Sequence, residues 1–85
     1  MLSVMFMMLT FGEKIRLLRE NAELSQAELG SAVNMTQRKI SYIERDKYEP
    51  GLDDIRAFCV FFNISADYLL GLAKKLPFPE RKSNI

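Results

Sequence analysis

Residues 25–44 read SQAELGSAVNMTQRKISYIE and predict two short helices joined by a tight turn. Ser25 and Glu28 have the spacing of a capping box, in which each side chain bonds a backbone N–H that the helix start leaves free. Thr36 stands where its side chain can cap the second helix. Asn34 falls in the turn, because Asn tolerates the left-handed backbone that such a turn needs. The stretch therefore carries a start signal for each helix and a turn between them.

The apolar positions of this stretch indicate which face of each helix is buried. Their spacing allows the two helices to pack on one core at a steep angle, and they comprise Leu29, Val33, Met35, Ile40 and Ile43. Gly30 leaves room where the second helix crosses the first closely. The first helix then braces the second, whose polar face is exposed. This pattern is typical of a helix-turn-helix, a motif that places its second helix in the major groove of DNA.

The composition favours one small globular domain that is not an enzyme. Of the 85 residues, 48% are hydrophobic and 27% are charged, which supports a single core. The chain has no His and one Cys, so zinc sites and Ser–His or Cys–His nucleophile pairs are excluded. Cys59 lies in an apolar run and is expected to be a buried, reduced thiol of a cytoplasmic protein. We expect no cofactor and no metal.

Residues 1–9 are an apolar arm or extension without a charged side chain. They are too few to span a bilayer, which takes roughly 20 apolar residues, so no membrane partner is expected. Two interpretations stay open. The segment packs on the core or on a second subunit, or it precedes a natural start at Met8.

A second capping box, Thr10 with Glu13, starts a helix that runs to about Ala22. The side chains of Phe11, Ile15 and Leu18 supply its buried stripe. The residues expected to face water are Glu13, Lys14, Glu20 and Glu23.

Further along, residues 52–62 form a strongly apolar helix that Asn63 ends, and Ser65 caps a fifth helix. We therefore expect an all-α, compact five-helix bundle with a helix-turn-helix over residues 10–71. Residues 72–85 contain two prolines and a polar end, which is typical of a C-terminal tail.

Several motifs resemble the phage-repressor-like (Xre/Cro) helix-turn-helix family over residues 11–71. They are Ile15–Glu20 (IRLLRE), Leu24–Leu29 (LSQAEL), Ile40–Arg45 (ISYIER), Pro50 and Ile64–Leu70 (ISADYLL). The resemblance implies a lambda-repressor-like fold and a DNA-binding protein of a bacterium or a bacterial mobile element.

The chain departs from this family at a few positions. Asn34, Asp46 and Asn63 stand where relatives carry Gly, and all three accept the left-handed conformation at some cost in strain. Gly30 stands where Ala is commoner, which weakens its helix by about 1 kcal/mol. The loop after the second helix of the motif has no arginine of the kind that some relatives place in the minor groove.

The candidate base-reading residues follow from the face opposite Ile40 and Ile43. Gln37 is suited to a bidentate contact with adenine and Arg38 to one with guanine, each discriminating by about 1–3 kcal/mol. Ser41 and Tyr42 are further candidates for base contacts. For Tyr42, a phosphate and a thymine methyl group are open alternatives.

Four other residues are candidate phosphate contacts. Gln26 and Thr36 lie at helix N-termini, where N–H groups and the helix dipole favour anions, although both also suit a capping role. Arg45 and Lys47 are candidate cationic partners of phosphates. Lys39 is expected to point away from DNA.

Arg19 and Glu44 are assigned a structural role by the resemblance, which implies an ion pair between the first helix and the end of the recognition helix. Removing one partner of such a pair leaves the charge of the other uncompensated.

The expected function is sequence-specific binding of double-stranded DNA by a transcription regulator, most simply a repressor that blocks polymerase. A homodimer would place two recognition helices in successive major grooves, about 34 Å apart. Candidate dimer contacts are Tyr68, Leu69, Leu72 and the N-terminal arm.

The alternative is a protein-interaction module, such as the antitoxin-like partner of a toxin. The net charge of +1 and the apolar N-terminus favour that protein partner. DNA binding would depend on local clustering of Arg38, Lys39, Arg45 and Lys47, and it would weaken steeply with salt.

Overall fold

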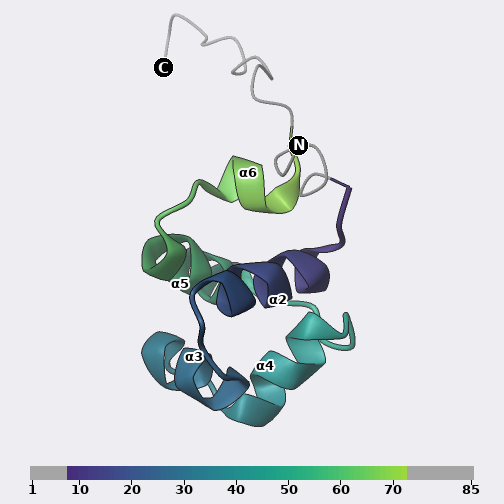
Figure 1. Ribbon diagram of the computed structural model, residues 1–85. Coiled ribbons are helices and arrows are strands. Elements are labelled where there is room, and N and C mark those ends of the chain that lie inside the picture. The colour runs from purple at the N-terminus through teal and green to yellow at the C-terminus, as the bar shows by residue number, and fades with distance from the viewer. Residues whose placement is uncertain (1–7, 73–85) are drawn as a thin grey trace, which may run out of the picture.

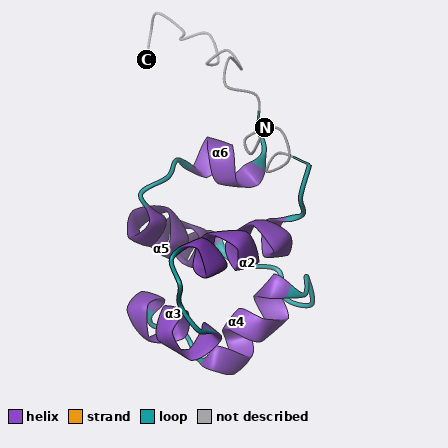
Figure 2. Ribbon diagram, in the orientation of Figure 1, coloured by secondary structure: helices purple, strands orange, loops and turns teal. Residues whose placement is uncertain are grey.

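The computed structural model describes residues 8–72, which contain five helices and no strand (Figures 1 and 2). In chain order the helices are α2 (Phe11–Asn21), α3 (Gln26–Val33), α4 (Gln37–Glu44), α5 (Leu52–Phe62) and α6 (Ala66–Leu70). The predicted all-α, five-helix architecture is therefore confirmed. The expected arm and tail fall almost entirely outside the described residues, so their proposed roles stay predictions.

Side-chain caps start four of the five described helices, α2, α3, α4 and α6. Thr10 Oγ1 accepts the N–H of Glu13 at 3.1 Å, and the Glu13 carboxylate accepts the N–H of Thr10 at 2.9 Å. Ser25 and Glu28 make the same reciprocal pair at the start of α3, at 3.0 and 2.8 Å. The remaining cap hydroxyls are those of Thr36 at α4 and Ser65 at α6. These caps satisfy N–H groups that no helical carbonyl reaches.

Left-handed residues end the helices or follow them closely. Asn34, Asp46 and Asn63 have φ values of 61°, 57° and 55°, which confirms the prediction made for all three. Glu23 also has a positive φ, of 59°, and the sequence gives no signal for it because Glu is not a residue that favours this conformation.

The core lies where the five helices converge. Its fully or almost fully buried side chains are Ile15, Leu29, Val33, Ile40, Ile43, Phe58 and Leu69. Met35 packs against this cluster but stays partly exposed. Figure 1 shows α3 and α4 on one side of α2 and α6 on the other. The helix-turn-helix therefore rests on α2, which fixes the direction in which α4 faces.

Lys14 corrects one prediction, because it does not face water. Its side chain is 3% exposed, and its Nζ donates a hydrogen bond to the carbonyl of Leu69 at 3.0 Å. Leu69 is at the C-terminal end of α6, where backbone carbonyls lack helical partners and attract cations. Burial lowers the pKa of the Lys14 ammonium.

Leu69 corrects a second prediction, because it cannot be a dimer contact. Its side chain is fully buried, at 0% exposure, among the core residues. Tyr68 is half-buried against the core, and Leu72 is 44% exposed. Of the predicted contacts on and after α6, only these two present surface.

The start of α2 and the end of α4 meet closely at Gly12. A Cβ atom there would overlap the carbonyl oxygen of Ile43 and lie 2.7 Å from that of Glu44. The Asp46 carboxylate accepts a hydrogen bond from Gly12 N at 3.0 Å and from Thr10 Oγ1 at 2.7 Å. This junction needs a residue without a side chain at position 12.

Candidate nucleic-acid interface

The eight-residue helix α4 has a buried face and an exposed face. Ile40 and Ile43 are 0% and 1% exposed and fix the helix on the core. The opposite face presents Gln37, Arg38, Tyr42 and Arg45 to solvent, with Ser41 half-buried beside them. The helical period thus brings all four candidate base-reading residues and Arg45 onto the surface that the core leaves free.

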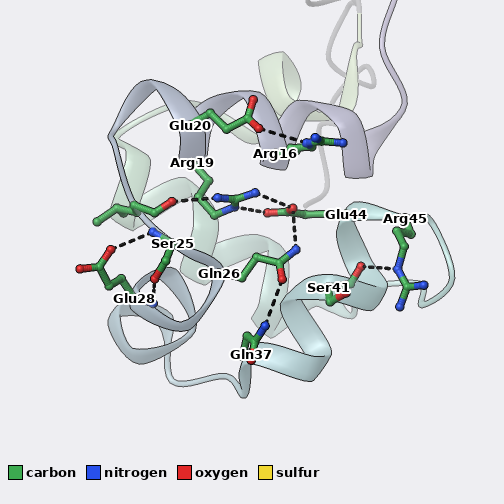
Figure 3. A network of polar contacts seen from close by, with 11 residues as sticks. Arg16, Arg19, Glu20, Ser25, Gln26, Glu28, Gln37, Ser41, Glu44 and Arg45 are labelled. Atoms are coloured by element: carbon green, nitrogen blue, oxygen red, sulfur yellow. Dashed lines mark hydrogen bonds and ion pairs between the residues drawn. The ribbon is translucent and has the colours of Figure 1, made fainter.

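An ion pair joins α2 to the end of α4 (Figure 3). The Arg19 guanidinium donates to both oxygens of Glu44, at 2.6 Å from Nε and 3.0 Å from Nη2. The remaining Nη1 donates to the carbonyl of Leu24 at 2.8 Å. The side chains of Arg19 and Glu44 are only 13% and 3% exposed, and the hydrogen bonds that Arg19 donates to Glu44 raise the pKa of Arg19. The planar fork of Arg matches a carboxylate in this way, so the pair holds α4 at a defined angle to α2.

Two glutamine amides extend this network to the surface. Gln26 Nε2 donates to Glu44 Oε1 at 3.1 Å, and Gln37 Nε2 donates to Gln26 Oε1 at 3.3 Å. Figure 3 shows the contacts running from Arg19 down to Gln37. The structure therefore brings together Gln26, a predicted phosphate contact, and Gln37, a predicted base contact, and orders both amides before any ligand is present.

Arg38, Tyr42 and Arg45 form a cluster on the exposed face, here called the Arg–Tyr–Arg cluster. The Tyr42 hydroxyl accepts from Arg38 Nε at 3.3 Å and from Arg38 Nη2 at 3.2 Å. The guanidinium carbons of Arg38 and Arg45 lie 5.5 and 5.2 Å from the centre of the Tyr42 ring. Arg45 Nε also donates to the carbonyl of Ser41 at 3.3 Å. Both cations are thus held near one aromatic ring by cation–π attraction.

The other candidate residues occupy separate positions. Thr36 uses its hydroxyl to cap α4, where it accepts the N–H of Lys39 at 3.1 Å. Lys47 is exposed after the end of α4. Lys39 is paired with Asp54 at 2.9 Å, and the hydrogen bond that its ammonium donates to Asp54 raises the pKa of Lys39. This pairing with α5 agrees with the prediction that Lys39 points away from the candidate DNA-facing side of α4.

Arg16 belongs to the same surface but has no role in the sequence-based prediction. It lines a hollow of about 250 Å³ between α2, α3 and α4, together with Arg19, Gln26, Ser41, Glu44 and Arg45. Its one ion pair, with Glu20 at 3.1 Å, is exposed, at 64% and 51% for the two side chains. Its place on this surface could have been inferred from the sequence, because Arg16 lies three residues before Arg19 and residues three apart share a helix face.

The described residues contain no group of three or more His, Cys, Asp or Glu side chains suited to a metal ion. Among the helices of residues 8–72, none has both the length and the apolar character that a membrane span requires.

A capped helix seated on a second one across a tight turn, with a polar face directed outward, defines the class of helix-turn-helix proteins. The chain belongs to this family, because the family model described as a helix-turn-helix domain matches residues 10–69. The family is a non-enzymatic class, in agreement with the expectation that the chain is not an enzyme.

Two curated relatives show which members of the family this chain is similar to. It is 29% identical over 63 residues to the immunity repressor protein of Bacillus phage phi105, covering 74% of this chain and 44% of that protein. It is 30% identical over 63 residues to the HTH-type transcriptional regulator ImmR of Bacillus subtilis, covering 74% and 50%. The chain thus spans about half the length of these relatives.

Two solved structures share the fold at 35% sequence identity and a TM-score of 0.69. One is a crystal structure of the P22 c2 repressor protein in complex with synthetic operator 9T, and the match covers 73% of this chain and 94% of that one. The other is the solution structure of the P22 c2 repressor DNA-binding domain, with 74% and 83% covered. The resemblance to the phage-repressor-like family is therefore confirmed.

Proposed function

We propose that residues 10–71 form the DNA-binding domain of a transcriptional repressor that reads double-stranded DNA with the exposed face of α4. The observation that carries this proposal is the ordered polar surface of α4, which the Arg19–Glu44 pair and two buried isoleucines hold in a fixed direction. The P22 c2 repressor, which is similar in fold and sequence, forms a complex with an operator. Such a protein would act in the cytoplasm of a bacterium.

The residues divide into three groups by role. Base edges in the major groove would be contacted by Gln37, Arg38 and Ser41, with Tyr42 beside Arg38 on the same face. Phosphates would be contacted by Gln26, Thr36, Arg45 and Lys47, which position the protein without reading sequence. Arg19 and Glu44 would hold the recognition helix and touch no base.

We propose further that the repressor binds as a homodimer. One copy of α4 is eight residues long and can contact only a few base pairs, whereas a two-fold pair would read an inverted repeat with half-sites about 34 Å apart. Tyr68 and Leu72 are the surface residues near α6 that such a dimer could use. Occupancy of the repeat would then block polymerase.

The test is selection from a pool of random duplex DNA with the purified protein, followed by sequencing of the retained duplexes. Enrichment of an inverted repeat is expected for the unmodified chain, and Arg38→Ala is expected to lose the guanine preference at one position of each half-site. The matched control is Arg56→Ala, which removes an exposed arginine of α5 that makes a loose, 3.9 Å ion pair with the exposed Asp53. Failure of any duplex to be retained would overturn the proposal and favour the alternative of a protein partner.

A further inference from the structure

We infer that Tyr42 is a positioning residue, whose hydroxyl orients Arg38 and thereby sets a preference for guanine at one operator position. This inference rests on the proposed function, which it deepens by naming what controls specificity. Neither Tyr42 nor Arg38 is needed for the core, since both side chains are on the exposed face of α4.

The argument begins with the mobility of an exposed arginine. Arg38 is a long side chain with many rotamers, and fixing such a side chain on binding costs conformational entropy. Residues four apart on a helix are neighbours on one face, so Tyr42 lies within reach of Arg38. The two hydrogen bonds from Nε and Nη2 to the Tyr42 hydroxyl select one orientation of the guanidinium before DNA arrives.

The atoms left free by this contact match what guanine requires. A guanidinium has five N–H donors, and the Tyr42 hydroxyl uses one on Nε and one on Nη2. The edge formed by Nη1 and the second hydrogen of Nη2 stays available. Two parallel donors of this kind fit the O6 and N7 acceptors of guanine in the major groove. Tyr42 thus leaves Arg38 with its guanine-reading edge directed outward.

Tyr42 can orient Arg38 because the tyrosine is itself held in place. Arg45 lies 5.2 Å from the ring centre and is tied to the backbone of α4 through the Ser41 carbonyl. The carbonyl of Tyr42 accepts the N–H of Lys47 at 2.8 Å, so the backbone that carries the ring is also held at the end of the helix. The Arg–Tyr–Arg cluster is therefore an ordered unit, in which the hydroxyl is the group that acts on Arg38.

The experiment uses the full chain and the operator selected as above, with a set of duplexes that vary one base pair at a time. The position read by Arg38 is first identified as the one whose guanine preference disappears in Arg38→Ala. Tyr42→Phe keeps the ring and its cation–π contacts but removes the hydroxyl. We expect it to reduce discrimination for guanine at that position by about five- to ten-fold, the scale of the net contribution of one typical hydrogen bond.

A double-mutant cycle separates positioning from direct reading. In an Arg38→Ala background, Tyr42→Phe should have no further effect on any base preference, because the hydroxyl has nothing left to orient. A loss of preference that persists in this background would show that Tyr42 reads DNA itself and would overturn the inference. Tyr48→Phe is the matched control, because Tyr48 is a second exposed tyrosine and the cation over its ring, at 5.2 Å, is the ammonium of Lys39.

The outcomes also distinguish this inference from the proposed function. If the unmodified chain selects no duplex, the proposed function fails and this inference fails with it. If the chain selects an operator but Tyr42→Phe retains full guanine preference, only the positioning role is wrong. Equal unfolding midpoints of the unmodified chain and Tyr42→Phe are expected, since the hydroxyl is on the surface.

Discussion

The Lys14 ammonium group on α2 donates a hydrogen bond to the carbonyl of Leu69 near the end of α6. The two residues are 55 positions apart in the sequence. The first and last described helices are thereby joined directly, because a buried cation meets the negative end of a helix dipole. A Cβ atom at Gly71 would lie 3.0 Å from the same ammonium group, so Lys14 also limits the residue that follows α6.

Replacing Lys14 with Met tests this contact. Met keeps most of the aliphatic stem but removes the donor, so we expect the free energy of unfolding to fall by about 1.5–3 kcal/mol, the range for a hydrogen bond to a charged group. Urea denaturation at neutral pH measures the loss. Lys14→Ala should cost more, since it also removes the stem, and an unchanged stability in both variants would contradict the structural role.

The pH dependence of stability should differ in sign between Lys14 and Lys39. Burial lowers the pKa of Lys14 below its ordinary value of 10.5, so the unfolded chain keeps this proton to higher pH and stability rises with pH up to about that value. Asp54 raises the pKa of Lys39 above 10.5, so its stabilisation is complete below 10.5 and is lost as pH rises through the folded-state pKa.

Denaturation of three proteins between pH 8 and pH 12 checks both signs. The unmodified chain should gain stability relative to Lys14→Met as pH approaches 10.5, and it should lose its advantage over Lys39→Met at higher pH. A common slope for all three proteins would show that neither lysine is responsible for the pH dependence.

Loss of the Glu44 carboxylate should destabilise the fold far more than loss of a surface arginine. Glu44→Ala leaves Arg19 without its partner at 13% exposure, and breaking such a pair typically costs about 3–5 kcal/mol. Arg38→Ala removes an exposed side chain and should stay within about 0.5 kcal/mol of the unmodified chain. Thermal unfolding monitored by circular dichroism compares them, and equal melting temperatures would refute the structural assignment of the pair.

Gly12→Ala should destabilise the chain although Ala favours helices more than Gly does. The added Cβ would overlap the backbone at the end of α4, which cannot move without displacing Ile43 from the core, and overpacking of this kind costs about 1–3 kcal/mol. Gly51→Ala is the control, because a Cβ there meets no atom within 4 Å. Its stability should change by less than about 1 kcal/mol, the scale of a cap substitution.

The salt dependence of DNA binding should distinguish Lys47 from Lys39. Lys47 is exposed beyond α4 and is free to neutralise a phosphate, so Lys47→Met should weaken binding to all sequences and reduce the slope of log K against log salt by about one. Lys39 is already paired with Asp54 at 2.9 Å. Lys39→Met should therefore leave the slope unchanged, and a reduced slope for Lys39→Met alone would reverse the assignment of the two lysines.

The features that could be predicted from sequence are those that neighbouring residues determine. The capping boxes at Thr10 and Ser25, the left-handed residues and the buried positions Ile40 and Ile43 each depend on spacing within a few residues. Helical periodicity also predicts that the candidate residues of α4 share one exposed face. Once Ile40 and Ile43 are assigned to the core, the residues on the opposite side of the helix must face solvent.

The features that were missed depend on contacts between distant segments. Lys14 was expected in water because a lysine on an amphipathic helix usually lies there, and the carbonyl of Leu69 that receives it is visible only once α6 is placed. The close approach at Gly12 requires the end of α4. Within the candidate site, the contact between Gln26 and Gln37 joins two helices, so no spacing rule reports it.

The separation of α4 into a face held by the core and a face free of it has a consequence for how such a protein can evolve. Ile40, Ile43 and Glu44 are the buried positions that keep the helix in place, whereas Arg38 and Tyr42 lie on the exposed face and are not part of the core cluster. Mutations at the outward pair can therefore accumulate with little loss of folding stability. Under the proposed function, a descendant of this protein would acquire a new operator by changing a few surface side chains, and the former target would then no longer be repressed.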